Sequence, residues 1–345
     1  MSQTPRSLGY RMPAEWATHQ ATWLSWPHKA ESWPGKLDRV LPVYAQAVAA
    51  LARSEPVRIN VNDAAMEAQA RALLAEAGAQ GQIQFHRFPT NDAWCRDHGA
   101  IFVVRDDAPR LAAIDWDYNA WGGKYPPYAL DGEIPRQMAA YLDVPCFPAG
   151  MVLEGGSIEV DGRGLLLTSE QCLLNPNRNP HLSQAEIELH LREFLGVDKI
   201  LWLGEGIVGD DTDGHIDDIA RFVAPGVVLA AVEEDPQDPN YHPLQENLRR
   251  LELMTDLMGN PLTILTVPMP PPLEYQGQRL PASHINYYIA NQIILLPTFG
   301  GASDGRVAAV LARCYPDRTI VGLDCTDVVW GLGAWHCLTQ QVPAV

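Results

Sequence analysis

Several features are absent from this 345-residue sequence, and each absence argues against a class of protein. No run approaches the roughly 18 consecutive apolar residues that span a membrane. The opening residues, MSQTPRSLGYRMPAEW, lack the apolar stretch of a secretory signal, so we expect a cytoplasmic protein. The six cysteines have no CxxC spacing, which argues against a zinc cluster and, in that compartment, against a disulfide framework.

Basic residues are also scarce. The chain has 25 Lys and Arg against 42 Asp and Glu, which gives a net charge of −17. An acidic surface repels nucleic acid and anionic membranes, so neither is an expected partner, and it mildly favours cationic ligands. No long linker or low-complexity tract divides the sequence, and we therefore expect residues 1–345 to form one domain. The sequence leaves open whether copies of the chain form a homo-oligomer.

What recurs along the chain is a β-hairpin. Two short β-rich runs separated by a polar turn occur four times, at residues 99–116, 156–169, 219–232 and 285–297. The last residues, WHCLTQQVPAV, predict one strand of a fifth hairpin whose partner is the N-terminal stretch 21–27. Helical stretches followed by short strands lie between the hairpins. In one of them, 183–196, Ser183 and Glu186 are spaced as a capping box and Gly196 marks the end.

Each hairpin is entered through a polar segment flanked by glycine. Equivalent positions in these segments are 51 to 69 residues apart: Asp97, Glu154, Asp217, Asn286 and Cys337. A loose period near sixty residues predicts pseudo-symmetric α/β units around a centre. If the units surround an axis, all five entrances converge on one site.

The third entrance, GDDTDGHIDD, places five aspartates around His215. Such a cluster is costly unless it is solvated or bound to a cation. A solvated loop is one interpretation. A metal site is less favoured, because the spacing lacks the ligand pattern of an EF-hand and His is a poor calcium ligand. In an extended segment, His215 and Asp217 would share a face.

Cys337 is either a small core residue or a nucleophile. In a strand, the adjacent His336 would point to the opposite face, so it is not the expected base. His215 is the better candidate, because it lies inside the dense polar cluster. Trp94 and Trp121 lie near the polar entrances, and aromatic walls suit cations and flat delocalised groups.

Taken together, the motifs resemble those of the agmatine deiminase and bacterial peptidylarginine deiminase family, within the guanidino-group-modifying (pentein) superfamily. The resemblance runs from about Met12 to Ala344. It rests on MPAEW, DAWCRDHGAIFV, NAWGGKY, LEGGSIEVDGRGLLLTSEQCLLNPNRNPHLS, DDTDGHIDDIARF, LPASHINYYIAN and HCLTQQVPA.

The resemblance implies a five-bladed α/β propeller of ββαβ units around a central active site, in a single catalytic domain. By motif, the nucleophile falls on Cys337, the general acid and base on His215, and the carboxylate that orients the histidine on Glu154. The carboxylates that grip a guanidinium fall on Asp97 and Asp217. Neither a metal nor an organic cofactor is implied. The family's usual approach to the nucleophile, GGGNxHC, reads GLGAWHC here, with Leu332 and Ala334 as departures.

The implied reaction converts agmatine and water to N-carbamoylputrescine and ammonia through a covalent thiouronium on the cysteine. Trp94 and Trp121 are expected to contact the substrate. Asp211, as a partly desolvated carboxylate, is expected to bind its distal ammonium. Two alternatives remain open: an arginine or peptidylarginine deiminase that forms citrulline, and a pentein scaffold that binds partners without catalysis.

Overall fold

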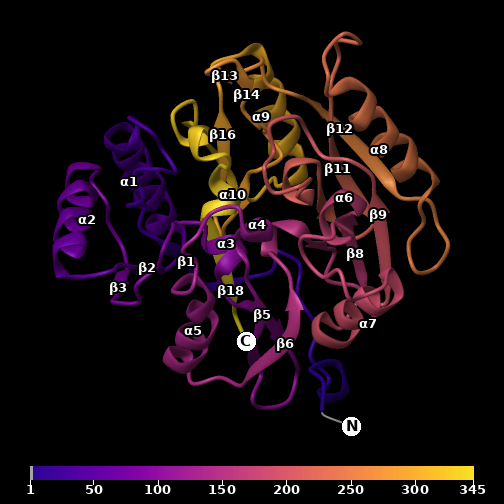
Figure 1. Cartoon of the computed structure of the whole chain (residues 1–345), viewed down its shortest axis with the longest axis horizontal. Helices are drawn as coiled ribbons and strands as arrows, with labels where there is room; N and C mark the ends of the chain where they lie inside the picture. The colour runs from indigo at the N-terminus through magenta and orange to yellow at the C-terminus, as the bar shows by residue number, and fades with distance from the viewer. Residues whose placement is uncertain (1–2) are drawn as a thin grey trace.

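The computed structural model describes residues 3–345 and has an α/β architecture of small mixed sheets arranged around a centre (Figure 1). In the first complete unit, β4 (Ile101–Val104) pairs antiparallel with β5 (Leu111–Asp117), and β5 pairs parallel with β6 (Cys146–Val152). Helix α5 (Ile134–Leu142) makes the crossover between β5 and β6. This is the predicted ββαβ order.

Three further units repeat the pattern of an antiparallel hairpin, a helix and a parallel strand. They are β7 (Glu159–Val160), β8 (Leu165–Ser169), α7 (Gln184–Leu195) and β9 (Lys199–Leu203); β10 (Ala220–Ala224), β11 (Val227–Val232), α8 (Tyr241–Leu253) and β12 (Thr263–Pro268); and β15 (Tyr288–Ile289), β16 (Ile293–Thr298), α9 (Ala302–Cys314) and β17 (Thr319–Asp324). A separate short hairpin joins β13 (Glu274–Tyr275) to β14 (Gln278–Arg279). All four predicted hairpins are confirmed.

The fifth sheet is built from both ends of the chain, in the order β18-β1-β2-β3. Strand β18 (Thr339–Pro343) runs antiparallel to β1 (His19–Ser25), with Trp23 opposite Gln340. The rest of this unit is α1 (Leu37–Ser54), β2 (Val57–Asn60), α2 (Ala64–Glu76) and β3 (Ile83–His86). The predicted pairing of the two ends is therefore confirmed, and it closes the ring of units.

Helix α7 illustrates how local sequence sets the element boundaries. The Ser183 hydroxyl accepts a hydrogen bond from the Glu186 backbone N–H, and the Glu186 carboxylate accepts one from the Ser183 backbone N–H. This capping box satisfies N–H groups that have no partner within the helix. At the other end Gly196 adopts a left-handed conformation, which glycine reaches without steric cost. The predicted helix is confirmed at both ends.

Within residues 3–345, four of the five hairpins are entered through single helical turns, and the β15–β16 hairpin is entered through a non-helical segment. The four turns are α3 (Cys95–His98), η3 (Gly155–Ser157), η4 (Ile216–Asp218) and α10 (Trp335–Leu338). Two expectations are wrong here. His215 and Asp217 do not share the face of an extended segment, because Asp217 lies inside the turn η4, and His336 and Cys337 lie in a helical turn that precedes β18.

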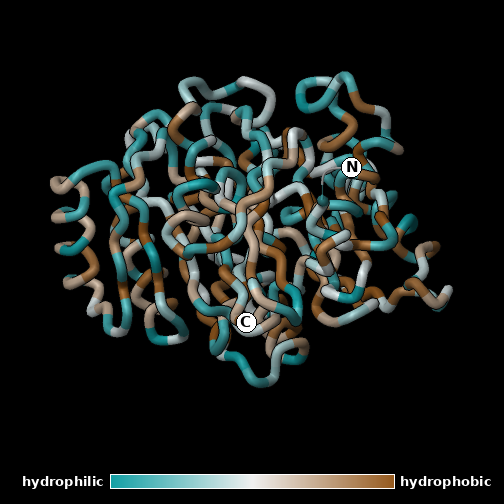
Figure 2. Tube along the Cα trace, turned by 90° about the horizontal axis from the view of Figure 1, so that it is seen from below, coloured by the Kyte–Doolittle hydropathy of each residue, from teal (hydrophilic) through white to brown (hydrophobic). Residues whose placement is uncertain are grey.

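The helices lie outside the sheets, and hydrophilic stretches gather in the outer loops, with hydrophobic stretches running through the interior (Figures 1 and 2). The apolar core includes three fully buried tryptophans, Trp23, Trp26 and Trp33. None of the helices described in residues 3–345 is long and apolar enough to cross a membrane.

Candidate active site

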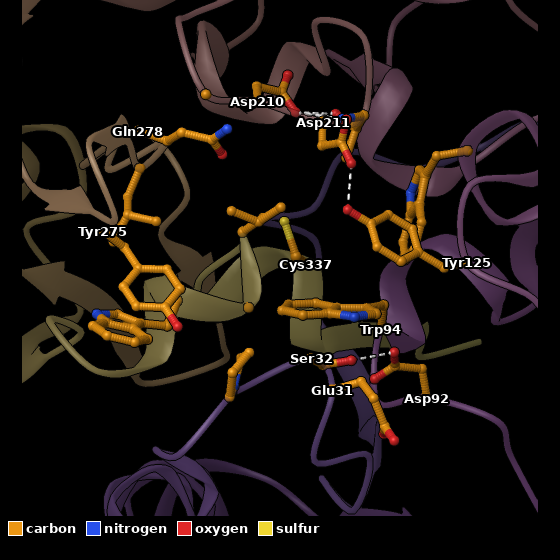
Figure 3. A pocket seen from close by; sticks show the side chains of 18 of the residues that line it. Glu31, Ser32, Asp92, Trp94, Tyr125, Asp210, Asp211, Tyr275, Gln278 and Cys337 are labelled. Atoms are coloured by element: carbon orange, nitrogen blue, oxygen red, sulfur yellow. Dashed lines mark hydrogen bonds between the residues drawn. The ribbon is translucent and has the colours of Figure 1, made fainter.

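A cavity of about 630 Å³ lies where the polar entrances meet, and Cys337 is in its lining (Figure 3). The ring of Trp94 lies beside Cys337 in this view, and Tyr125 and Tyr275 face each other across the cavity. The acidic residues of the lining are Glu31, Asp92, Asp97, Asp210 and Asp211. A cavity with aromatic walls and acidic residues suits a cationic ligand.

The structure brings together all five residues that the motifs single out for catalysis. Cys337 Sγ lies 3.6 Å from Asp217 Oδ2. His215 Nδ1 lies 3.9 Å from Asp97 Oδ1, and His215 Nε2 lies 4.0 Å from Glu154 Oε2. All five side chains are buried. Residues up to 240 positions apart in the sequence thus share one small volume.

Asp97 is held by hydrogen bonds on both carboxylate oxygens. The Gly156 backbone N–H donates to Oδ1 at 3.0 Å, and the Trp121 indole N–H donates to Oδ2 at 3.0 Å. Burial raises the pKa of Asp97 to about 6, with Asp217 and Glu154 adding to the rise and His215 opposing it. A cation between these carboxylates would favour their ionised forms.

Gly156 makes this close approach of charged groups possible. A Cβ atom at this position would lie 2.5 Å from His215 Nδ1 and 2.9 Å from Asp97 Oδ1. It would also lie 3.1 Å from Asp217 Oδ2. Any larger residue would therefore force the three groups apart.

His215 lies between two carboxylates. Burial lowers its pKa, but Asp97, Cys172 and Asp217 outweigh burial and raise the pKa well above its ordinary value. Among the described residues, neither ring nitrogen has a hydrogen-bond partner. The raised pKa favours the protonated imidazolium, which is the state that a general acid requires.

Glu154 is fixed in place by Arg178. The Arg178 Nε–H donates to Glu154 Oε1 at 2.6 Å, and both side chains are buried. The other oxygen, Oε2, is the one near His215. Arg178 comes from the NPNRNP segment of the motif, but sequence reasoning assigned it no role, because its contacts with Glu154 depend on tertiary structure.

The Cys337 thiol is surrounded by negatively charged side chains. Burial raises its pKa well above the ordinary value, and Asp217, Asp218 and Asp97 raise it further. The Asn286 side-chain amide donates a hydrogen bond to Sγ at 3.0 Å, which favours the thiolate. The resting protein therefore holds a neutral thiol, and a bound cation would promote its ionisation.

Asn286 organises the turn that carries the nucleophile. Its side-chain oxygen accepts hydrogen bonds from the backbone N–H groups of Ala334, His336 and Cys337, at 3.2, 3.1 and 3.3 Å. Its amide nitrogen also donates to Asp218 Oδ1 at 3.1 Å. The sequence marked Asn286 only as a polar entrance, and nothing in the local pattern indicated that it spans two entrances.

His336 is not positioned to act as a base for Cys337, as expected. The reason is the engagement of its ring by other residues, and not the strand geometry that we expected. In the turn α10, His336 Nδ1 lies 2.6 Å from Asp217 Oδ2 and Nε2 lies 2.8 Å from Glu15 Oε2. Glu15 belongs to the MPAEW segment, to which the sequence assigned no role. The ring is fully engaged by two carboxylates.

The aspartates of the third entrance have separate roles. Asp210 accepts hydrogen bonds from the backbone N–H groups of Thr212, Gly214 and His215, and so shapes the loop. Asp213 is paired with Arg178 at 2.7 Å and with Lys124 at 2.9 Å. The segment is therefore an ordered wall of the cavity, and the interpretation as a plain solvated loop is wrong.

Asp211 lines the cavity and is of intermediate burial. Its side chain is 43% exposed, and its carboxylate accepts a hydrogen bond from the Tyr125 hydroxyl and lies 3.4 Å from Lys124 Nζ. The side chain is therefore partly covered, in line with the expected partly desolvated carboxylate, and it lies at the mouth of the cavity. Trp94 and Trp121 also line the cavity, as expected.

One group of side chains has the composition of a metal site. Single ligand atoms of Glu154, Cys172 and His215 lie within 4.8 Å of one another, and all three residues are buried. Arg178, bonded to Glu154, places a positive charge beside this group. This charge opposes a bound cation.

The two departures near the nucleophile differ in their structural effect. Leu332 has a φ of 69°, in the left-handed region that an L-residue with a side chain enters at a cost of about 1 kcal/mol. Its neighbours Gly331 and Gly333 have no room for a side chain. A Cβ atom on Gly331 would lie 2.8 Å from the ring of Trp94, and one on Gly333 would lie 2.7 Å from the same ring. Ala334 contributes only its backbone N–H to Asn286.

Comparison with known proteins gives consistent matches over the whole chain. Residues 11–343 match the model of the Porphyromonas-type peptidyl-arginine deiminase family. A Legionella pneumophila protein is 44% identical, over 99% of this chain and 97% of its own length. Agmatine deiminase of Pseudomonas aeruginosa is 39% identical, with 99% and 98% covered. The structure of Enterococcus faecalis agmatine deiminase superposes with a TM-score of 0.92 at 33% identity, with 99% and 98% covered.

Proposed function

The chain belongs to the Porphyromonas-type peptidyl-arginine deiminase family, and we propose that it is an agmatine deiminase that hydrolyses agmatine to N-carbamoylputrescine and ammonia. Its similarity over nearly the full length to agmatine deiminases of Pseudomonas aeruginosa and Enterococcus faecalis supports this substrate. We further propose that the whole chain acts as one catalytic domain, and homo-oligomerisation stays a prediction.

The observation that carries the proposal is the position of the thiol among carboxylates. Asp97 and Asp217 flank the space beside Cys337, and Asp217 Oδ1 is buried without a hydrogen-bond partner among residues 3–345. A guanidinium offers paired N–H donors and a positive charge, so it would satisfy both carboxylates. The same positive charge lowers the pKa of the thiol and favours the attacking thiolate.

The proposed reaction proceeds through a covalent intermediate. The Cys337 thiolate attacks the guanidinium carbon, and His215 donates its proton to the departing nitrogen, which leaves as ammonia. The carbon then remains bound to sulfur as a thiouronium. His215, now neutral, removes a proton from water, and the resulting hydroxide adds to the carbon. The C–S bond then breaks, the sulfur leaves with the bonding electron pair and takes up the hydroxyl proton, and the ureido product is released with the thiol restored. Glu154, held by Arg178, orients the imidazole in both steps.

The charges that line the cavity favour agmatine over arginine. Arginine needs a cationic partner for its carboxylate, whereas agmatine ends in an ammonium. Among the described residues of the lining, Arg279 is the only Lys or Arg, and its Nη1 lies 2.6 Å from Asp238 Oδ2. Asp211 at the cavity mouth supplies negative charge for the ammonium. The scaffold alternative is less favoured, because binding alone requires neither the buried thiol nor the charged histidine.

A panel of guanidino compounds tests the proposal. We expect kcat/KM, scored as ureido product, to be highest for agmatine and much lower for arginine, benzoyl-arginine amide and an uncharged alkylguanidine. Exhaustive chelation with EDTA should leave the rate unchanged. Preference for arginine or the arginine amide would contradict the substrate, and loss of activity that a divalent ion restores would contradict the metal-free mechanism.

Substitution of the nucleophile tests the covalent step. Cys337→Ala should lower kcat by several orders of magnitude while the protein stays folded and binds agmatine in a calorimetric titration. Cys314→Ala, which changes a cysteine of α9 outside the cavity lining, is the matched control and should retain activity. A Cys337→Ala rate within about tenfold of the original would overturn the covalent mechanism.

A further inference from the structure

A network of buried charges surrounds His336, a residue that takes no part in the proposed steps. His336 contacts Asp217 on one side of the ring and Glu15 on the other, at 2.6 and 2.8 Å. Glu15 Oε2 also lies 2.9 Å from Arg221 and 3.3 Å from Arg96. All of these side chains are at most a few per cent exposed.

The two contacts of the ring constrain its protons. A neutral imidazole has one N–H donor and one nitrogen lone pair. If both carboxylates are ionised, a neutral His336 would place that lone pair against a carboxylate lone pair at hydrogen-bond distance. The three groups must therefore hold two protons between them, one in each contact.

The cations beside the two carboxylates keep both of them ionised, and the two protons required by the contacts are then both on the ring. Burial raises the pKa of Glu15, but Arg221, His336 and Arg96 together hold it well below its ordinary value. Burial also raises the pKa of Asp217, and the bond and charge of His336, together with the charges of His215 and Arg221, outweigh this and lower it. Burial, Arg221 and Arg96 lower the pKa of His336 against the opposing effect of both carboxylates. Each of the two short contacts requires a proton between its atoms, and the lowered pKa of both carboxylates leaves the ring as the place for both protons. His336 is therefore an imidazolium.

With a charged His336 the network is electrically balanced. Its three cations are Arg96, Arg221 and His336, and its three carboxylates are Glu15, Asp217 and Glu159, the last bonded to Arg221 Nε at 2.6 Å. Burial raises the pKa of Glu159 to about 7, so this balance holds where Glu159 is ionised, and a neutral His336 would then leave one buried negative charge uncompensated. The two short contacts of the His336 ring do not depend on Glu159.

We propose that His336 is a positioning residue: a buried imidazolium, anchored by Glu15, that keeps Asp217 ionised and directs its free oxygen toward the substrate guanidinium. Burial and the neighbouring carboxylates Asp97 and Asp218 disfavour the charge of Asp217, whereas His215 and Arg221 favour it. His336 is the cation in direct contact with the carboxylate, at 2.6 Å. The link to the guanidinium rests on the proposed function, whereas the protonation of His336 does not.

Charge removal at His336 separates positioning from mere packing. His336→Gln keeps a polar side chain but cannot be cationic. We expect kcat/KM for agmatine to fall at least about 100-fold at pH 6, the scale expected when a buried charge loses its partner. We also expect the acid limb of the pH profile to move upward by at least one pH unit, because Asp217 then ionises less readily. An equal loss at every pH would mean a structural role and would overturn the proposal.

His284 provides a matched control. It is also a buried histidine, but its ring contacts the Pro297 carbonyl and the Ser303 hydroxyl and does not line the cavity. His284→Gln should lower the melting temperature without moving the acid limb. A shift of the same size in this variant would also overturn the proposal, since any buried histidine would then produce it.

Nuclear magnetic resonance of the ¹⁵N-histidine-labelled protein tests the imidazolium without using activity or a folded His336 variant. At pH 7 and without ligand, we expect one deeply buried histidine, close in space to Trp335 and Leu338, whose two ring nitrogens both carry a proton. A ring at this position with one unprotonated nitrogen would overturn the proposal. An imidazolium in a protein that does not deiminate agmatine would instead contradict the proposed function and leave His336 as inferred.

Discussion

Asp97 sets the pH dependence expected at the scale of single residues. Its pKa is raised to about 6, chiefly by burial. Below that pH the free protein carries a protonated Asp97, which cannot pair with a guanidinium. We therefore expect kcat/KM for agmatine to fall about tenfold per pH unit below pH 6. A profile of kcat/KM that stays flat down to pH 4.5 would contradict this.

This loss of activity should precede acid unfolding. Because the folded-state pKa of Asp97 lies above the unfolded value near 3.9, the folded form binds the proton more tightly. The contribution of Asp97 to stability therefore grows as the pH falls from about 6 to about 4. Circular dichroism measured over the same pH range should show a folded protein where the rate has already fallen.

Asp211 is the residue expected to distinguish agmatine from simpler guanidino compounds. Since its side chain is 43% exposed and lies near Lys124, we expect Asp211→Asn to lower kcat/KM for agmatine by about tenfold or less, the scale of an exposed ion pair. An uncharged alkylguanidine, which has no ammonium to bind, should be affected much less. Equal losses for both compounds would mean that Asp211 only shapes the loop.

Among the structural elements, the turn η3 determines how closely the charged groups approach. Gly156→Ala should lower kcat by at least about 100-fold, because the added methyl group would displace His215 and Asp97 from contact distance. Gly305→Ala in α9 is the matched control, since a Cβ atom there meets nothing within 4 Å. It should leave the rate unchanged and stabilise the helix by about 0.5–1 kcal/mol. Normal activity of Gly156→Ala would contradict the described packing.

At the scale of the whole molecule, β18 closes the ring by pairing with β1. Ending the chain after Leu338 keeps Cys337 but removes the strand, including Val342, which is fully buried. We expect the free energy of unfolding to fall by at least about 4 kcal/mol, the scale of losing a large buried side chain, and activity to be lost with it. Removing only the half-exposed Val345 should change neither. Chemical denaturation of both shortened proteins measures the difference.

The sequence by itself determined the local elements and the set of reactive residues. Hairpins and helices such as α7 follow from alternation, turn residues and capping, which act over a few positions. The spacing of the polar entrances indicated a ring, and the resemblance assigned Cys337, His215, Glu154, Asp97 and Asp217 to one site. The structure places these five together, although Cys337 lies in a helical turn and a 3-10 turn begins directly after His215.

Only the tertiary structure decided which groups accompany these residues. Asn286 reaches Cys337 across 51 positions, and Glu15 reaches His336 across 321. Whether Asp211 is buried or exposed likewise depends on where its loop lies against Tyr125 and Lys124. Local sequence patterns report on neighbours along the chain, whereas hydrogen bonding, desolvation and charge balance act between neighbours in space. The protonation state of a buried group can therefore be inferred only when the fold shows which groups surround it.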